Sequence, residues 1–260
     1  MESQRITFPG STGAPLAARL ELPDEAPRAF ALFAHCFTCG KDSLAAVKIA
    51  RALAARGIAT LRFDFTGLGG SGGDFANASF SANVGDLVAA ADWLRRTHQA
   101  PALLVGHSLG GAAVLAAAGG VPECRAVATI AAPADASHAL HNFQDALAEI
   151  ESRGAAQVTL GGRPFTISRG FVEDLRAQRQ AERIADLKRA LLVLHAPLDE
   201  TVGIEQATRI FTSARHPKSF VSLDDADLLL SRPADGDYAA EVIAAWAGRY
   251  LPAAADTPPA

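Results

Sequence analysis

A serine flanked by glycines carries the strongest chemical signal in the sequence. Residues 106–110 read Gly-His-Ser-Leu-Gly, which places Ser108 at the centre of a Gly-x-Ser-x-Gly pattern. The apolar run 102–105 before it predicts a strand, and the small residues after it predict a buried helix. A serine on such a strand-to-helix turn is presented with its hydroxyl exposed. The pattern therefore predicts Ser108 as the nucleophile of an acyl-transfer reaction.

Two backbone amides are expected to stabilise the negative charge that this attack creates. The helix after the serine would place the Leu109 N–H at its N-terminus, where the helix dipole favours an anion. The Phe37 N–H is the expected second donor, because it follows a strand expected over 28–35. Cys36 and Cys39 flank it with the spacing of a dithiol redox motif, which is the competing interpretation of this loop. A redox pair normally opens a helix, whereas the helix expected here begins later in the chain.

An aspartate follows a later strand at the position of an orienting acid. Residues 190–195 predict a buried strand, and Asp199 lies four residues after its end. A serine followed by an acid and then a histidine is one of the chain orders in which a catalytic triad occurs. Asp199 could instead cap the helix expected over 204–214. The serine pattern upstream favours the catalytic interpretation.

The positions of the seven histidines decide whether a general base is present. His35 and His107 lie at expected strand ends beside the site, and His138 and His141 begin a segment that we expect to overhang Ser108. These four are the candidate substrate-binding histidines. His138 and His141 are also the best alternatives for a base, although a place in the pocket lining is the simpler interpretation of both.

Apolar strands alternate with amphipathic helices over most of the chain. This alternation predicts an α/β fold, with a mostly parallel sheet that is flanked by helices and opened by an antiparallel hairpin. The alternation breaks between residues 133 and 186, where we expect an inserted helical cap. One domain over 1–251 follows, and the Pro- and Ala-rich residues 252–260 are expected to be disordered. Strands are expected at 4–8, 16–22, 28–35, 58–63, 102–105, 126–131, 190–195 and 219–223, and cap helices at 138–153 and 171–184 around a turn-rich stretch at 158–167.

Composition excludes several other classes of protein. The chain has 24 basic and 28 acidic side chains, a net charge of −4 and 49% hydrophobic residues, which excludes a disordered chain and a polybasic nucleic-acid binder. The uncharged stretch 100–122 is interrupted by glycines, so we expect no membrane span. Three cysteines and the absence of an apolar signal segment favour a reducing, cytoplasmic compartment. The spacing of His and Cys predicts no metal site, no cofactor motif is complete, and the oligomeric state is left open.

Together these motifs resemble the α/β-hydrolase superfamily. The resemblance is closer to the bacterial serine hydrolases that occur either alone or fused to an OsmC-type peroxidase domain. It implies a serine hydrolase of esterase or acyl-hydrolase type, which acts on a small-molecule ester or acyl compound without a cofactor. The segments that carry it are 35–42, 62–69, the turn at Ser108, 132–135 and 216–223, and they span the chain to about Tyr250.

The same resemblance places the base histidine after the last strand, in an Ala-Asp-His-Leu-Leu stretch. Residues 226–230 of this chain read Ala-Asp-Leu-Leu-Leu, so Leu228 occupies that position, and no histidine follows His216. Asp227 would reach the position in a register shifted by one, but a carboxylate with a pKa of about 4 is a poor base at pH 7. The expected triad therefore has its nucleophile and its acid, and a vacant base position.

Three hypotheses for function follow from the vacant position. In the first, the chain is a serine hydrolase that is slow or inactive, because loss of a triad member lowers kcat by up to roughly 10⁶-fold. In the second, His138 or His141 of the cap replaces the missing base. In the third, the chain is a non-catalytic homologue that holds a small ligand in the pocket.

Overall fold

The computed structural model describes residues 1–252 and confirms the expected α/β fold. All but the first residue of the tail expected over 252–260 lies outside the described residues. No helix among the described residues is long and apolar enough to cross a membrane. The strands are β1 (Glu2–Pro9), β2 (Pro15–Leu22), β3 (Ala29–Ala34), β4 (Ile58–Phe63), β5 (Leu103–His107), β6 (Ala126–Ile130), β7 (Ala155–Leu160), β8 (Arg163–Ser168), β9 (Ala190–His195) and β10 (Lys218–Ser222). The helices are α1 (Leu44–Ala54), α2 (Phe80–Thr97), α3 (Leu109–Ala117), α4 (Leu147–Arg153), α5 (Arg169–Arg176), α6 (Gln180–Ala185), α7 (Ile204–Ser213) and α8 (Pro233–Ala247), with 3₁₀ helices η1 (Phe75–Asn77), η2 (Ala118–Gly120) and η3 (Ala136–Ala146).

Eight strands form one sheet in the order β1-β2-β4-β3-β5-β6-β9-β10. The β1–β2 and β2–β4 pairs are antiparallel, and every other neighbouring pair in this sheet is parallel. The carboxyl ends of the parallel strands meet at one edge, where ligands bind in open α/β sheets. The segments that follow β3, β5, β9 and β10 carry Phe37, Ser108, Asp199 and Leu228 to that edge.

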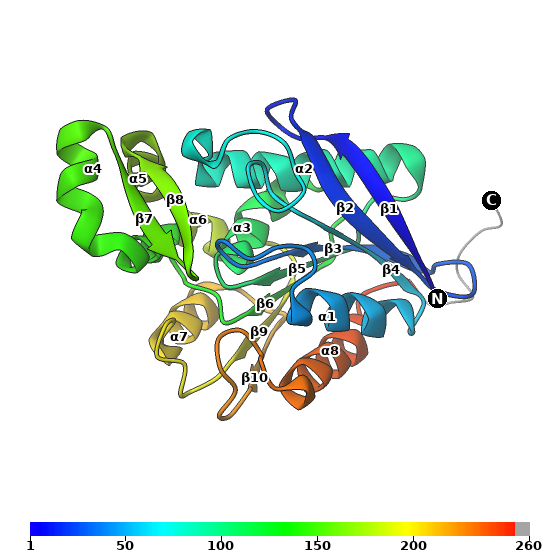
Figure 1. Ribbon diagram of the computed structural model, residues 1–260. Helices are drawn as coiled ribbons and strands as arrows, with labels where there is room; N and C mark the ends of the chain where they lie inside the picture. The colour runs from blue at the N-terminus through cyan, green and yellow to red at the C-terminus, as the bar shows by residue number, and fades with distance from the viewer. Residues whose placement is uncertain (253–260) are drawn as a thin grey trace.

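Different helices cover the two faces of the sheet (Figure 1). Successive side chains of a strand point to opposite faces, so Leu32 enters one hydrophobic cluster and Phe33 the other. Helices α1 and α8 pack in the cluster of Phe33, whereas α2, α3 and α7 pack in the cluster of Leu32. Strands β3, β5, β6 and β9 are buried along their whole length, as in a parallel sheet covered on both sides.

The segment between β6 and β9 differs in detail from the helical cap expected there. The stretch 158–167 was expected to be a turn, but it forms the antiparallel hairpin β7–β8, whose turn residues Gly161 and Gly162 have φ of 55° and 75°. The expected helix over 138–153 is interrupted at Phe143, where φ is −145°, and is divided into η3 and α4. The expected helix over 171–184 is divided into α5 and α6. Hairpin and helices lie together at one end of the molecule in Figure 1.

Phenylalanines join this segment to the loop after β3. The Phe37 ring stacks on Phe171 with centroids 5.8 Å apart and lies 6.5 Å from Phe143. The Phe75 ring lies 6.0 Å from Phe37, 6.1 Å from Phe171 and 4.8 Å from Phe165 of the hairpin. Aromatic pairs at these distances are mutually stabilising. The position of the loop after β3 is therefore set partly by the cap.

A buried ion pair between β2 and β4 also contacts the loop after β3, and its contribution to the stability of the protein can be tested. Arg62 is 3% exposed, donates to the Glu21 carboxylate at 2.7 Å and also donates to the Lys41 carbonyl at 2.6 Å. Arg62→Met would leave the Glu21 charge buried without its partner, so we expect a loss of about 3–5 kcal/mol in the free energy of unfolding. Removing the exposed Arg95–Glu123 pair by Arg95→Met should cost no more than about 1 kcal/mol. Urea unfolding measures both, and equal losses would contradict the expected difference.

Candidate active site

Ser108 occupies a strained turn between β5 and α3. Its φ is 53° and its ψ is −125°, a conformation that residues other than glycine rarely adopt. The turn is held because the Ser108 N–H donates to the Ile130 carbonyl at 2.8 Å and the Ser108 carbonyl accepts from Gly111 N–H at 2.8 Å. Ser108 immediately precedes the first residue of α3, Leu109, as the Gly-x-Ser-x-Gly pattern predicts.

The glycines of the pattern allow the helix and two strands to approach closely. A methyl group on Gly110 would lie 2.3 Å from the His35 carbonyl oxygen, and one on Gly106 would lie 2.3 Å from the Gly110 carbonyl oxygen. Both distances are far below van der Waals contact, and the obstacles are backbone atoms that cannot rotate away. The spacing of glycines around Ser108 is therefore a packing requirement of the turn.

Gly110→Ala is expected to destabilise the protein severely. The added methyl group must displace the backbone of the loop after β3, so we expect a loss of about 3 kcal/mol or more, or failure to accumulate soluble protein. Gly119→Ala is the matched control, because no atom lies within 4 Å of the position of its methyl group. Thermal unfolding of the two variants provides the comparison, and a Gly110→Ala protein as stable as the control would contradict the packing argument.

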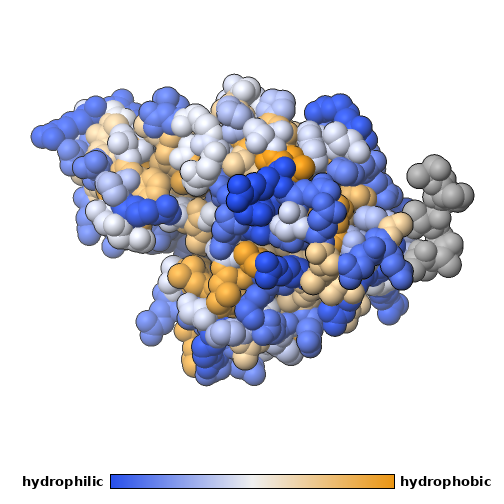
Figure 2. Space-filling view, turned by 45° about the vertical axis from the view of Figure 1, so that its right-hand side comes forward, coloured by the Kyte–Doolittle hydropathy of each residue, from blue (hydrophilic) through white to orange (hydrophobic). Residues whose placement is uncertain are grey.

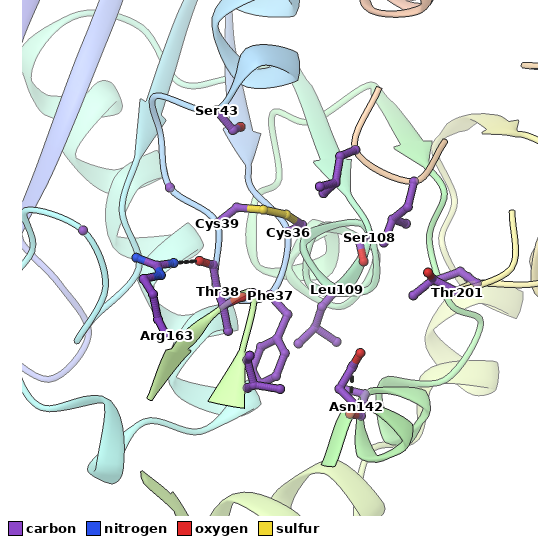
Figure 3. Close-up of a pocket in the computed structure, with 18 of the residues that line it drawn as sticks. Cys36, Phe37, Thr38, Cys39, Ser43, Ser108, Leu109, Asn142, Arg163 and Thr201 are labelled. Atoms are coloured by element: carbon purple, nitrogen blue, oxygen red, sulfur yellow. Dashed lines mark hydrogen bonds between the residues drawn. A yellow bond between two sulfur atoms is a disulfide. The ribbon is translucent and has the colours of Figure 1, made fainter. Parts of the chain in front are cut away.

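The loop after β3 lines a cavity of about 750 Å³ together with Ser108 (Figure 3). Cys36 and Cys39 are joined by a disulfide in this loop. Thr38, between them, has a φ of 65°, and Arg163 of β8 donates a hydrogen bond to its carbonyl. Within residues 1–252, neither the Phe37 N–H nor the Leu109 N–H has a hydrogen-bond acceptor, although both residues line the cavity. Two free amides beside a serine can receive an oxyanion.

Asp64 holds the other end of this loop, a function that its position in the sequence did not reveal. It is 1% exposed, accepts from the Lys41 N–H at 2.6 Å and from the Lys41 Nζ at 2.9 Å, and accepts from the Gly70 N–H at 2.8 Å. Although burial opposes it, hydrogen bonding to Asp42 and Asp64 raises the pKa of Lys41. The loop after β3 and the glycine-rich loop after β4 are thus tied to one carboxylate.

Asp199 is buried and hydrogen-bonded to Thr201 and Val202, which line the cavity, and one of its two carboxylate oxygens has no partner among the described residues. Oδ1 accepts hydrogen bonds from the N–H groups of Thr201 and Val202, both at 2.9 Å. These two bonds orient the carboxylate, and they resemble a helix cap only in part because the next helix begins at Ile204. Oδ2 is buried and has no hydrogen-bond partner among the described residues. A buried charged oxygen without a donor is costly, so it marks a place where a donor is missing.

His35 and His107 are buried and hydrogen-bonded to backbone, and neither lines the cavity. The His107 Nε2–H donates to the Leu228 carbonyl at 2.5 Å, which ties the loop after β10 to the residue beside Ser108. The His35 Nδ1–H donates to the Cys36 carbonyl at 2.8 Å. Burial lowers the pKa of both imidazoles, so both are neutral at pH 7.

These two imidazoles should make the protein less stable in mild acid. A histidine with a lowered pKa binds fewer protons in the folded than in the unfolded chain, so stability is complete above the unfolded pKa of about 6.5 and falls as the pH drops below it. We expect the urea midpoint to decrease between about pH 6.5 and pH 5, above the range where carboxylates titrate. His107→Gln should reduce this slope, and an unchanged slope would show that His107 does not contribute to it.

Leu228 and Leu229 both line the same cavity as Ser108; Leu228 is half-buried and Leu229 is 50% exposed. The loop that carries them is held by the His107 bond and by Asp227, which accepts from the Ser231 N–H at 2.9 Å. Figure 2 shows hydrophobic side chains close to a hollow between lobes of the surface. The loop after β10 thus brings two isobutyl groups, and no imidazole, to the cavity lining.

The cap contributes two imidazoles to the cavity lining. His138 Nε2–H donates to the Thr201 carbonyl at 3.0 Å, and His141 Nδ1–H donates to the His138 carbonyl at 2.9 Å. The other nitrogen of each ring has no hydrogen-bond partner among the described residues. Among residues 1–252, no group of three or more His, Cys, Asp or Glu side chains could hold a metal ion.

The order of strands, the helices on both faces and the strand-to-helix turn at Ser108 define the chain as an α/β hydrolase. Residues 25–169 match the family described as serine aminopeptidase, S33, and the chain belongs to this family of α/β hydrolases. The resemblance seen in the sequence is thereby confirmed at the level of the superfamily. No curated protein matches the chain.

Solved structures similar to the chain include the esterase domain of a Rhodothermus marinus protein. It is 50% identical, with a TM-score of 0.80, and the match covers 96% of this chain and 99% of that one. Est1E from Butyrivibrio proteoclasticus, with ferulic acid bound, is 18% identical over 94% of this chain and 98% of that one, with a TM-score of 0.78. An α/β serine hydrolase without lid from Xanthomonas campestris is 23% identical over 99% and 98%, with a TM-score of 0.68. The last two show the fold alone.

Proposed function

We propose that the protein is a serine hydrolase of carboxylic esters or related acyl compounds whose turnover is limited by a missing general base. Ser108 is its nucleophile, Asp199 its orienting acid, and the amides of Phe37 and Leu109 form its oxyanion hole. Leu228 occupies the position of the base. The similarity to an esterase domain at 50% identity supports the reaction class.

The unpartnered Asp199 Oδ2 carries this proposal. In a complete triad the acid accepts a hydrogen bond from the base, and that bond fixes the tautomer and orientation of the imidazole. Here Oδ1 accepts from two backbone amides, while Oδ2 is buried and has no donor within residues 1–252. The Asp199 carboxylate is thus held like the acid of a triad, but there is no imidazole at position 228 for it to orient.

The proposed reaction proceeds through an acyl-enzyme without a cofactor. Ser108 Oγ attacks the carbonyl carbon, and the oxygen that gains charge accepts hydrogen bonds from the two amides. Collapse of this intermediate expels the alcohol, and water then releases the acid. Both steps need a group that takes a proton from the nucleophile and returns it to the leaving group. Leucine cannot do so, and the oxyanion hole alone leaves about 10³- to 10⁴-fold acceleration over water.

Phosphonylation tests the nucleophile independently of turnover. A fluorophosphonate should label Leu228→His protein once, at Ser108, and wild type much more slowly, because the serine of the wild type lacks a base; peptide mass spectrometry should locate the adduct there. Ser108→Ala is the control and should remain unlabelled. If Ser108 is not labelled even when a histidine is restored at position 228, the nucleophile assignment is wrong and a ligand-binding role is favoured. The observation in favour of that role is a cavity of about 750 Å³ that persists beside an incomplete triad.

A cap histidine as the base is the second catalytic candidate. His138 and His141 line the cavity with Ser108, and each ring retains one nitrogen free of hydrogen bonds to the described residues. If wild-type protein hydrolyses p-nitrophenyl esters rapidly, His141→Ala or His138→Ala should abolish the activity. If wild type is slow and neither substitution matters, both are residues of the pocket lining.

The protein is proposed to act in the cytoplasm, as its cysteine content indicates. A disulfide is unusual in a reducing compartment unless it takes part in redox chemistry. The Cys36–Cys39 bridge therefore needs an explanation other than structural cross-linking.

A further inference from the structure

The Cys36–Cys39 disulfide lies in the wall of the cavity that contains Ser108, where a change in loop conformation would alter the candidate active site. Cys36 and Cys39 both line the cavity that contains Ser108, and Figure 3 shows the bridge in the wall beside the labelled serine. The two residues inside the bridge are Phe37 and Thr38. The bridge therefore encloses the amide that we assign to the oxyanion hole.

A bridge of this span contributes little to the stability of the fold. Stabilisation by a disulfide increases with the length of chain that it closes, because longer loops lose more freedom in the unfolded state. Cys36 and Cys39 are three positions apart, so the closed loop is among the shortest possible. Its effect must be local.

The local effect is a constrained turn. Thr38 has a φ of 65°, and a β-branched residue rarely adopts this left-handed conformation. The turn is also closed by the Cys39 N–H, which donates to the Cys36 carbonyl at 3.1 Å, and by the Arg163 hydrogen bond to Thr38. Opening the bridge removes a covalent restraint from a conformation that the chain would otherwise leave.

We propose that Cys36 and Cys39 form a thiol–disulfide exchange site, at which a small dithiol that enters the cavity reduces the bridge and releases the loop carrying the Phe37 amide. The proposed exchange is inferred from the position of the disulfide and does not depend on the function of Ser108. Its effect on catalysis rests on the proposed function of Ser108 and Phe37.

The chemistry balances with a dithiol as the two-electron reductant. One thiolate of the dithiol attacks the Cys39 sulfur, which is the more accessible because Cys36 is only 4% exposed and Cys39 is half-buried. The Cys36–Cys39 bond breaks, Cys36 leaves as a thiolate and a mixed disulfide forms. The second thiolate of the reductant then attacks the reductant's first sulfur, which is bonded to Cys39 in the mixed disulfide, and Cys39 leaves as a thiolate. The products are two protein thiols and an oxidised, cyclic disulfide, and the protons of the dithiol pass through solvent to the two cysteines.

The surroundings favour the oxidised form as the resting state. Reactive thiolates are stabilised at helix N-termini, but α1 begins at Leu44, after the Cys36–Cys39 turn. A helix dipole therefore does not stabilise the reduced form, so we expect the pair to be a weaker oxidant than a pair that opens a helix. Strongly reducing dithiols are therefore needed to open it.

The remaining cysteine is a suitable internal control. Cys124 is buried, and burial raises the pKa of its thiol to about 12. It stays protonated and unreactive in the folded chain. Cys124→Ser therefore simplifies thiol counting and leaves the Cys36–Cys39 site unchanged.

The test compares the oxidised and reduced full-length Cys124→Ser protein under native conditions. Dithiothreitol followed by alkylation should add two alkyl groups, at Cys36 and Cys39, and oxidised dithiothreitol should reverse the reaction before alkylation. Amide hydrogen exchange in peptides covering residues 36–43 should accelerate at least tenfold on reduction, while β6 should exchange at its original rate. A bridge that resists the dithiol until the protein unfolds, or one that is reduced without any change in exchange, would overturn the proposal.

Two further comparisons separate this proposal from the proposed function. Cys36→Ser/Cys39→Ser should exchange rapidly without dithiol and show no response to it; if this variant does not fold, reduction of the unsubstituted pair still decides the question. In Leu228→His protein, reduction should slow fluorophosphonate labelling of Ser108 at least tenfold. Failure to label Ser108 in either state counts against the nucleophile, whereas alkylation and hydrogen exchange still decide whether the bridge is an exchange site.

Discussion

Leu228→His is expected to increase the hydrolysis of p-nitrophenyl esters by about 10²- to 10⁴-fold in kcat/KM. The substitution places an imidazole in the cavity that Ser108 shares, on a loop whose backbone is fixed by the His107 hydrogen bond to the Leu228 carbonyl. Asp199 Oδ2 is available to accept from the new ring. The upper value is below the roughly 10⁶-fold effect of removing a triad histidine, because an introduced ring will not reach an evolved geometry.

Leu229→His is the matched control for this gain. Leu229 belongs to the same loop, also lines the cavity and is 50% exposed, so a histidine there adds an imidazole to the cavity lining one position away from the vacant base position. We expect less than about a twofold change from it. The pH profile provides a second check, since activity that depends on a neutral imidazole should rise through a pKa of about 6.5. Equal gains from both substitutions would indicate non-specific catalysis and contradict the assignment of Leu228.

Local patterns predicted the reactive turn well. Glycines around a serine, between an apolar strand and small helical residues, act through contacts between neighbours in sequence, and the strained φ of Ser108 follows from them. The parallel sheet was predictable for a related reason, because strands that are buried on both faces read as continuous apolar runs. The fold and the candidate nucleophile could therefore be predicted from patterns among residues that are close in sequence.

The loop after β3 could not be predicted in the same way, because distant residues hold it. Asp64 ties it to the glycine-rich loop, Arg163 reaches it from the hairpin, and Phe171 stacks on Phe37 across 134 positions of sequence. The hairpin itself was missed because Gly161 and Gly162 mark a turn equally well with or without paired strands. The Cys36–Cys39 spacing did signal a redox interpretation, but only the fold places the pair in the wall of the Ser108 cavity.

Asp199→Asn should have very different consequences in two backgrounds, and the difference tests whether the site is a triad lacking one member. In Leu228→His protein, the amide would present a donor in place of an acceptor or hold the imidazole in the wrong tautomer, and we expect activity to fall by about 10²- to 10⁴-fold, which removes the gain. In wild type there is no imidazole at position 228 to orient, so the same substitution should change ester hydrolysis by less than about threefold.

The non-additivity of the two substitutions is the quantity to measure. Triad residues act as a unit, so the gain from Leu228→His should disappear when Asp199 is neutralised, and a double-mutant cycle on kcat/KM should give a coupling of about 3–5 kcal/mol. Asp224→Asn, in the loop after β10, is the charge control and should leave both backgrounds unchanged. If Asp199→Asn lowers wild-type activity as strongly as that of the restored protein, Asp199 already orients a base in the wild type. That result would move the assignment to a histidine of the cap, because His138 and His141 are the imidazoles that line the cavity within residues 1–252.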